Sequence, residues 1–385
     1  MRAYWVWLAQ MTGVSAQRKI ALLREYVNAK ELHDAGKHAI LTLENTTLRE
    51  RDAFEYRNLD KAKRIVEECD EKGIGILPIT SKLYPEQLRK IPDPPIILYF
   101  KGQIPRWDTL PAIGIVGTRK GSLYGMQCAF EMGKQISACG GLVVSGGALG
   151  VDAQAMEGAL RHGYPTVGIL GSGLSTLYPT VNRPLYDATV RNGCLLSEYA
   201  PDEPAYPGNL SRRNRLISGI SHGVLVVEAP EKSGALITAR YAKEQGKPLF
   251  VVPGNLDNPA CAGSNALLRE GAKAALSGYD VVGEFKYLFP ERVRDALVDQ
   301  LKPGPLVRQT DKKGIDKPQK AQYSTKEPQP ELKGDEKIVY DLLTEEPVPV
   351  DIIIMKSGIG ASRVLVAITM LTIAKRIKNH PGKYI

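Results

Sequence analysis

The spacing of apolar positions divides the chain of 385 residues into regions with different periods. In roughly the first 75 residues, apolar side chains recur three and four positions apart, and "SAQRKIALLREYV" places Ile20, Leu23 and Val27 along one helix face. Ser15 precedes this run and is a typical N-cap. The pattern predicts a small helical domain of the helix-hairpin-helix (SAM-like) kind, in which backbone amides touch DNA phosphate or the helices serve packing alone.

Residues 76–111 are interrupted by prolines and form a lead-in segment. From 112 to 300 the pattern changes, and short β-branched runs alternate with amphipathic helical stretches. These runs are "AIGIVG", "GLVVSGG", "TVGILGSG", "CLLSEY", "GVLVVEA" and "PLFVVPG". Unbroken apolar strands separated by helices are typical of a sheet buried on both faces. The pattern therefore predicts an α/β fold with a doubly wound, Rossmann-like parallel sheet.

Residues 301–333 are rich in Pro, Lys and Gln and contain few apolar side chains, so they predict a flexible linker. Residues 334–385 return to a folded pattern. Three helical stretches, "DEKIVYDLL", "VPVDIIIMKSG" and "SRVLVAITMLTIAKRI", precede a short ribbon, "KNHPGKYI". This order predicts a winged-helix-like domain. The middle of its third helix is apolar rather than basic, which favours a core or protein-binding face over DNA readout.

Composition narrows the class of partner. A net charge of +9 and a pI of about 9.1 favour a polyanion, although mild basicity also serves solubility alone. The five cysteines form neither a CxxC pair nor a Cys/His cluster, so we expect buried thiols and no metal site. The apolar "YWVWLAQM" is too short for a membrane span, and we expect a cytoplasmic protein without membrane contact.

Glycines and hydroxyls follow the predicted strands repeatedly. In an open parallel sheet, ligands lie beyond the carboxyl ends of the strands, where loops and helix N-termini offer N–H groups to anions. We therefore predict a phosphate-binding face. Its candidate residues are Gly117, Thr118, Arg119, Ser122, Tyr124, Gly125, Ser145, Gly146, Gly147, Gly171, Ser172, Ser233 and Thr238.

The segment "SRRNRLISG" concentrates positive charge between two of the strands, on the side of the glycine loops. Arginine holds phosphate oxygens in a planar fork and keeps its charge when partly buried. Arg212, Asn214 and Arg215 are therefore candidate phosphate ligands. The alternative is structural, with arginines that pair with Asp152, Glu198 and Glu228 to fasten the sheet edge. Both interpretations can hold for different arginines.

Enzyme signatures are missing from the chain. "GTRKGSLYG" is not the GxGxxG of dinucleotide enzymes, and no Walker A lysine, GxSxG elbow, HExxH pair or two histidines at metal spacing occur. Asp152 and Glu198 follow apolar strands and could form an acid/base pair. A carboxylate beside arginine-rich loops more often orients those arginines or caps a helix. We expect neither catalysis nor a cofactor.

The motifs "GIVGTRKGSLYG", "SGGALGVDAQAMEGAL", "GSGLSTLYPTVNRPLY", "SRRNRLISGISHGVLVVEA" and "SGALITARYAKEQGKPLFVVPG" closely resemble the DNA-processing protein A (DprA, also called Smf) family. The resemblance implies a non-enzymatic protein that binds single-stranded DNA, protects incoming strands and loads the RecA recombinase in natural transformation. It also implies a homodimer through the central domain. It assigns Arg119, Ser122 and Tyr124–Gly125 to a first phosphate loop, Ser145–Gly146 to a second and Asn214–Arg215 to a basic loop.

The chain departs from the family at three positions: Met156 replaces a frequent histidine, Leu149 a frequent arginine and Ser211 a usual proline. The missing arginine weakens one expected DNA contact, and the missing histidine suits a binding role. The alternative function is nucleotide binding or hydrolysis of nucleoside monophosphates, as in the lysine-decarboxylase-like group with a related sheet. That group's PGGxGTxxE motif is absent, and "APEKSGALITA" stands at the comparable strand end.

Overall fold

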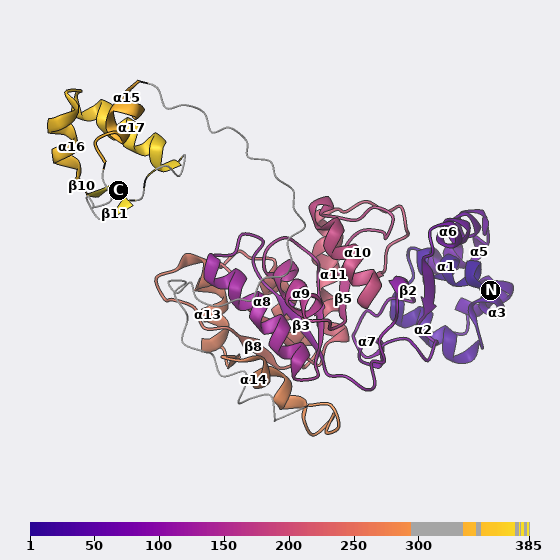
Figure 1. Cartoon of the computed structure of the whole chain (residues 1–385). Coiled ribbons are helices and arrows are strands. Elements are labelled where there is room, and N and C mark those ends of the chain that lie inside the picture. Colours follow the sequence, from indigo (N-terminus) through magenta and orange to yellow (C-terminus); the bar gives the residue numbers. More distant parts are fainter. Residues whose placement is uncertain (294–333, 344–347, 374–376, 378, 381–382, 385) are drawn as a thin grey trace. The chain divides into compact units, whose positions relative to one another are not determined.

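The computed structural model describes residues 1–293, 334–343, 348–373, 377, 379–380 and 383–384. The chain divides into two compact units, Met1–Arg308 and Gln309–Ile385 (Figure 1). The predicted linker, residues 301–333, lies outside the described residues. In the described part of the chain, no helix combines the length and apolar character that crossing a bilayer requires.

The N-terminal region is helical, as its periodicity predicts. Its helices are α1 (Arg2–Gln10), α2 (Ala16–Glu25), α3 (Ala29–Ala35), α4 (Lys37–Ile40), α5 (Leu48–Glu55) and α6 (Asp60–Glu71). The Ser15 side chain caps α2 by accepting a hydrogen bond from the Arg18 N–H at 3.3 Å. Thr47 and Glu50 form a capping box at the start of α5, which satisfies backbone donors at both positions. Side-chain caps therefore set where α2 and α5 begin.

The central sheet has nine strands in the described residues, in the order β1-β2-β6-β5-β4-β3-β7-β8-β9. The six runs identified from sequence are β3 (Ala112–Val116), β4 (Leu142–Ser145), β5 (Thr166–Leu170), β6 (Cys194–Ser197), β7 (Gly223–Val226) and β8 (Leu249–Val251). All of them pair in parallel. The predicted doubly wound α/β fold is confirmed.

Three further strands extend this sheet. They are β1 (Gly75–Pro78), β2 (Ile97–Gly102) and β9 (Lys273–Ala274). Strand β2 pairs antiparallel with both β1 and β6, so the lead-in segment 76–111 contributes directly to the sheet. The domain boundaries stay a prediction, but the segment joins the helical region to the sheet by backbone hydrogen bonds.

Helices cover both faces of the sheet (Figure 1). Along β3, Ile113 and Ile115 face one buried cluster, and Ala112 and Val116 face the other, as the two-residue period of a strand requires. The helices and 3-10 turns of this region are α7 (Glu86–Arg89), α8 (Leu123–Ala138), α9 (Val151–Arg161), η1 (Thr180–Asn182), α10 (Arg183–Asn192), α11 (Pro207–Ile220), α12 (Ala235–Glu244), η2 (Pro259–Cys261), α13 (Ala262–Arg269), α14 (Gly278–Val282) and η3 (Gly283–Phe285).

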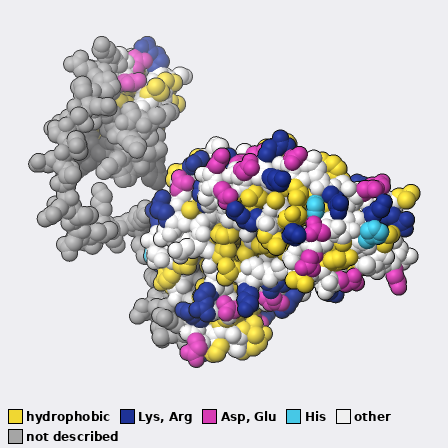
Figure 2. Space-filling model, turned by 90° about the vertical axis from the view of Figure 1, so that its right-hand side faces the viewer, with side chains coloured by type: hydrophobic (Ala, Val, Ile, Leu, Met, Phe, Trp, Pro, Cys, Tyr) yellow, Lys and Arg dark blue, Asp and Glu magenta, His cyan; other side chains and the backbone are white. Residues whose placement is uncertain are grey.

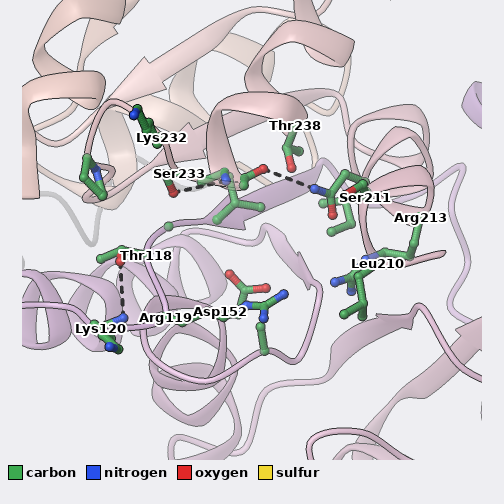
Figure 3. A pocket seen from close by; sticks show the side chains of 18 of the residues that line it. Thr118, Arg119, Lys120, Asp152, Leu210, Ser211, Arg213, Lys232, Ser233 and Thr238 are labelled. Carbon is green, nitrogen blue, oxygen red and sulfur yellow. Dashed lines mark hydrogen bonds between the residues drawn. The ribbon is translucent and has the colours of Figure 1, made fainter. Parts of the chain in front are cut away.

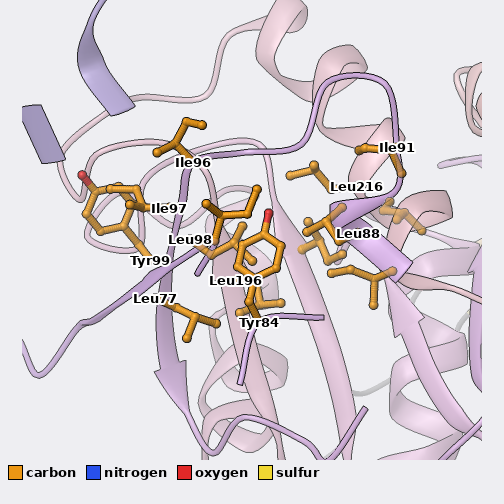
Figure 4. Close-up of a cluster of buried hydrophobic side chains, with 14 of the residues drawn as sticks. Leu77, Tyr84, Leu88, Ile91, Ile96, Ile97, Leu98, Tyr99, Leu196 and Leu216 are labelled. Carbon is orange, nitrogen blue, oxygen red and sulfur yellow. The ribbon is translucent and has the colours of Figure 1, made fainter. Parts of the chain in front are cut away.

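One buried cluster joins the N-terminal helices to the sheet. Figure 4 shows the part of it around Tyr84, Leu98 and Leu196. It contains Leu8 of α1 and Leu22 of α2 together with Leu98 of β2 and Leu196 of β6. Tyr84 lies inside it, only 2% exposed, and its hydroxyl donates to the Pro95 carbonyl at 2.7 Å. The helical region therefore shares its hydrophobic core with the sheet.

The C-terminal unit contains α15 (Asp335–Tyr340), α16 (Val350–Ser357) and α17 (Ala361–Ile373). Its small antiparallel sheet has the order β10 (Val348–Pro349), β12 (Lys383–Tyr384), β11 (Asn379–His380). Val339, Ile353 and Leu371 form part of its own buried core. Three helices and this ribbon are the architecture of a winged helix, as predicted.

Helices α8 and α9 pack closely through two glycines. A Cβ on Gly133 would lie 2.0 Å from the Ala155 carbonyl oxygen, and a Cβ on Gly158 would lie 2.0 Å from the Phe130 carbonyl oxygen. No heavy atom tolerates such an approach. Both positions are helical, where alanine is intrinsically favoured over glycine by about 1 kcal/mol. Packing therefore overrides propensity at this crossing.

We predict that Gly158→Ala lowers the free energy of unfolding by about 2 kcal/mol, because the helices must separate to admit the methyl group. The measurement is denaturant unfolding followed by circular dichroism. Gly208→Ala in α11 is the matched control, since nothing lies within 4 Å of the added methyl group. Equal midpoints for the two variants would contradict this account of the α8–α9 contact.

Candidate functional site

A cavity of about 770 Å³ opens at the carboxyl ends of the parallel strands. Residues that follow β3, β4, β5 and β7 line it, together with the first turns of α11 and α12 (Figure 3). A smaller space adjoins it and shares Arg119, Ala148 and Tyr178 with it. The glycine loops that the sequence identifies separately therefore meet at one place.

Three basic side chains surround the larger cavity (Figure 3). Arg119 and Lys120 follow β3, and Lys232 follows β7. All three are exposed, and in the described part of the chain their side chains have neither a hydrogen bond nor an ion pair. The sequence reasoning missed Lys120 and Lys232, although each directly adjoins a predicted loop residue. Their charges are available to an anion.

Polar groups of the cavity wall supply further donors. Asn214 Nδ2 donates to the Gly234 carbonyl at 3.2 Å, and Ser233 Oγ accepts from the Ala235 N–H at 3.2 Å. Thr118 Oγ1 accepts from the Lys120 N–H at 3.2 Å. Because each hydroxyl accepts in these bonds, its own proton stays free to donate into the cavity.

A buried charge pair closes the floor of the site. Arg213 donates through Nη1 to the Gly146 carbonyl at 2.6 Å and also to the Ile169 carbonyl. Asp152 Oδ2 accepts from the Gly146 N–H at 3.2 Å. Burial lowers the pKa of Arg213 and raises the pKa of Asp152, while each charge opposes the shift of the other. The pair holds the loop after β4 against β5.

The structure brings only part of the predicted set to these cavities. The larger cavity is lined by Gly117, Thr118, Arg119, Asn214, Ser233 and Thr238, and the smaller one by Arg119, Gly146 and Gly171. The other candidates, Ser122, Tyr124, Gly125, Ser145, Gly147, Ser172, Arg212 and Arg215, line neither.

Ser122 and Gly125 serve the start of α8. The Ser122 side chain accepts from the Gly125 N–H at 3.0 Å, and its hydroxyl donates to Glu228 at 2.8 Å. The Ser122 N–H donates to the other Glu228 oxygen at 2.7 Å. A Cβ on Gly125 would meet that carboxylate at 2.3 Å. Tyr124 nearby donates to the Pro253 carbonyl at 3.1 Å.

The hydroxyls of the second and third loops are also committed. Ser145, fully buried, donates to the Ile115 carbonyl at 2.6 Å, and the hydroxyl of Ser172, 1% exposed, donates to the Gly173 carbonyl at 3.3 Å. The Gly147 carbonyl accepts from Asn182 and Tyr186. These groups hold the loops rather than facing a ligand.

The arginines of "SRRNRLISG" take different roles. Arg215 is 5% exposed and donates to Glu198, with its Nε 3.4 Å from Asp93. Arg212, more exposed, lies 3.1 Å from the same Asp93. The structural interpretation therefore describes Arg213 and Arg215, and Asn214 alone of this segment's predicted residues reaches the cavity.

Two of the three family departures lie at these cavities: Ser211 lines the larger and Leu149 the smaller. Met156 is fully buried instead. The carboxylates beside these loops, among them the acid/base candidate Glu198, also accept hydrogen bonds within the protein. Glu228 is 1% exposed, with both oxygens bonded to Ser122, and Glu198 accepts from Arg215.

Comparison with known proteins identifies similar chains. The family described as DNA recombination-mediator protein A matches residues 75–286, and the DprA winged helix domain matches residues 324–383. A DNA processing protein DprA of Bacillus subtilis is 40% identical over 232 residues, 60% of this chain and 77% of its own. The Synechocystis protein Smf is 30% identical over 99% of this chain and 97% of its own length.

Solved structures show the same fold. The X-ray structure of DNA processing protein A from Streptococcus pneumoniae is similar with a TM-score of 0.64 and 28% identity, over 74% of this chain and 98% of that chain. A second, from Helicobacter pylori, is described by its single-stranded DNA binding mode. It has a TM-score of 0.51 and 32% identity, over 56% of this chain and 96% of that chain.

We predict that Glu228→Gln lowers the free energy of unfolding by about 2 kcal/mol. Both carboxylate oxygens of Glu228 accept hydrogen bonds from Ser122, and in the variant an amide NH₂ group replaces one of these acceptors. The measurement is the denaturant midpoint. Glu231→Gln, an exposed carboxylate three residues further along the same loop, is the control. If both variants unfolded at the same midpoint, the assignment of Glu228 as an anchor of α8 would be wrong.

Proposed function

We propose the function of this chain from the family to which it belongs, the DNA-processing protein A (DprA/Smf) recombination mediators. We infer that it binds single-stranded DNA at the cavity described above. The observation that carries this proposal is the ring of Arg119, Lys120 and Lys232 around a concave space lined by hydroxyls. Phosphate contacts of this kind provide most of the affinity for a strand irrespective of its sequence.

The shape of the site favours a single strand. A concave cavity admits the separate phosphates and bases of a flexible strand, whereas a duplex presents its phosphates on a convex rod. Tyr178 lines both cavities and is 47% exposed, so a base can stack on its ring. The N-termini of α9 and α12 also open here and favour anions.

We propose that the chain acts by binding and not by catalysis. The carboxylates nearest the glycine loops, Asp152 and Glu228, are 5% and 1% exposed and accept hydrogen bonds from the protein's own backbone. A general acid or base must instead reach its substrate. This supports a mediator that holds the strand for another protein, and the resemblance to the family implies RecA as that protein.

The winged helix is proposed as a partner-binding module. Leu365, Val366 and Met370 of α17 are 49%, 64% and 49% exposed, on the helix that would enter the DNA groove. Apolar side chains in that position favour contact with protein over contact with DNA.

We predict that Arg119→Ala combined with Lys232→Ala lowers affinity for single-stranded oligonucleotides about tenfold or more and reduces the slope of log affinity against log salt by about 1.4. The same variant should fail to speed RecA filament formation on the strand. Fluorescence anisotropy at several salt concentrations measures the first effect. Lys61→Ala combined with Lys63→Ala, both on the exposed side of α6, is the control. An unchanged affinity and slope would refute the proposed site.

We also propose a homodimer through the central domain. In the described part of the chain β9 is the last strand of the sheet, so one of its edges is unpaired, and Leu276 beside it is 71% exposed. Light scattering should give twice the chain mass of 42.1 kDa, and Leu276→Lys should shift it toward the single-chain value. A monomer at all concentrations would disprove the dimer.

A further inference from the structure

A separate cavity, of about 470 Å³, lies away from the two at the sheet edge, between the N-terminal helical region and α10. Four basic side chains line it: Lys72 at the end of α6, Lys101 on β2, and Arg183 and Arg191 on α10. Its remaining wall is largely apolar, from Leu174, Leu177, Val190 and Leu195. Lys101 and Leu195 are direct cross-strand partners, so the β2–β6 ladder forms its floor.

The charges of this cavity are only partly neutralised from within. Lys72 lies 2.7 Å from Glu68, and Arg183 Nε lies 3.7 Å from Asp187. Glu68 also accepts from the Ser175 hydroxyl at 3.1 Å. In the residues that the structure describes, the Lys101 and Arg191 side chains have neither a hydrogen bond nor an ion pair. Two cations are therefore left for a ligand.

Surrounding charge does not explain this concentration. On the face that carries the N-terminal helices, basic side chains are interspersed with acidic and apolar ones (Figure 2). Four basic side chains against one carboxylate in a single cavity lining differ from that mixture. A concave site lined by cations suits a phosphate-bearing ligand.

Residues of one segment, 171–178, line both the cavities at the sheet edge and the Lys101–Arg191 cavity. Gly171 and Tyr178, at the ends of the segment 171–178, line the cavities at the sheet edge. Leu174, Ser175 and Leu177, from the middle of that segment, line the second cavity. A strand that leaves the first site past Tyr178 therefore follows this segment and then α10 to reach Arg191 in the last turn of α10 and Lys101, which pairs with the second residue of β6.

We propose that the Lys101–Arg191 cavity is a second phosphate-binding site, which holds the continuation of the single strand bound at the first. This inference rests on the proposed function. The phosphates of a free nucleotide have the same chemistry, but the ligand proposed here is the DNA strand. Lys101 and Arg191 hold the backbone phosphates of the strand.

The test compares oligothymidines of about 5 and about 30 nucleotides, because single-strand sites on one domain span about 4–16 nucleotides. Lys101→Gln combined with Arg191→Gln removes both charges and keeps polar stems of similar shape. We expect affinity for the long strand to fall about tenfold and its salt slope to drop by about 1.4, with binding of the short strand unchanged. Lys61→Gln combined with Lys63→Gln loses the same net charge elsewhere and should behave as the native chain.

Each other outcome overturns the proposal. If the paired variant binds the long strand like the control, the second site is wrong, while loss of binding in the Arg119/Lys232 variant would leave the proposed function standing. If the Arg119/Lys232 variant also binds normally, the proposed function itself fails. Loss of deoxythymidine triphosphate binding alone would identify a free-nucleotide site, and loss of RecA contact alone a protein surface. Circular dichroism and thermal unfolding establish that the variant is folded.

Discussion

The guanidinium of Arg213 is the interaction on which the edge of the sheet depends. It enters from α11 and donates to the carbonyls of Gly146 and Ile169, so one side chain ties a helix to the loop after β4 and to the end of β5. A Cβ on Gly146 would lie 2.4 Å from that guanidinium, which explains the glycine. Buried carbonyls at strand ends need donors, and a buried cation needs acceptors and a counter-charge, here Asp152.

The basic side chains near the site fall into two groups: those bonded within the protein and those exposed to a ligand. Arg213 donates to buried carbonyls and Arg215 donates to Glu198, so both side chains are bonded within the protein and fix the loops. Arg119, Lys120 and Lys232 remain exposed around the cavity without internal partners in the described residues. Rigid loops with unpaired cations at their rim can hold an anion without first breaking an ion pair. This combination supports the strand binding proposed for the cavity.

Hydrophobic packing and backbone hydrogen bonds between strands hold the helical region against the sheet. Leu8 and Leu22 share one core with Leu98 and Leu196, and β2 hydrogen-bonds to β6. The second basic cavity exists because α6, β2 and α10 are held together there. The proposed second site therefore depends on the way the N-terminal region is joined to the sheet.

The sequence by itself determined the helical start, the six parallel strands, the winged helix and the family, because apolar period, caps and glycine loops are local signals. It did not reveal that 97–102 joins the same sheet, since antiparallel pairing with β6, a strand about a hundred residues away, leaves no local trace, and 75–78 enters the sheet only by pairing with 97–102. Tertiary structure also decided the roles within "SRRNR". Successive helical residues point about 100° apart, so Arg212 reaches Asp93, Arg213 the sheet edge, Asn214 the cavity and Arg215 Glu198. Composition counts such charges alike, and only the packing around the helix determines which of them a ligand can reach.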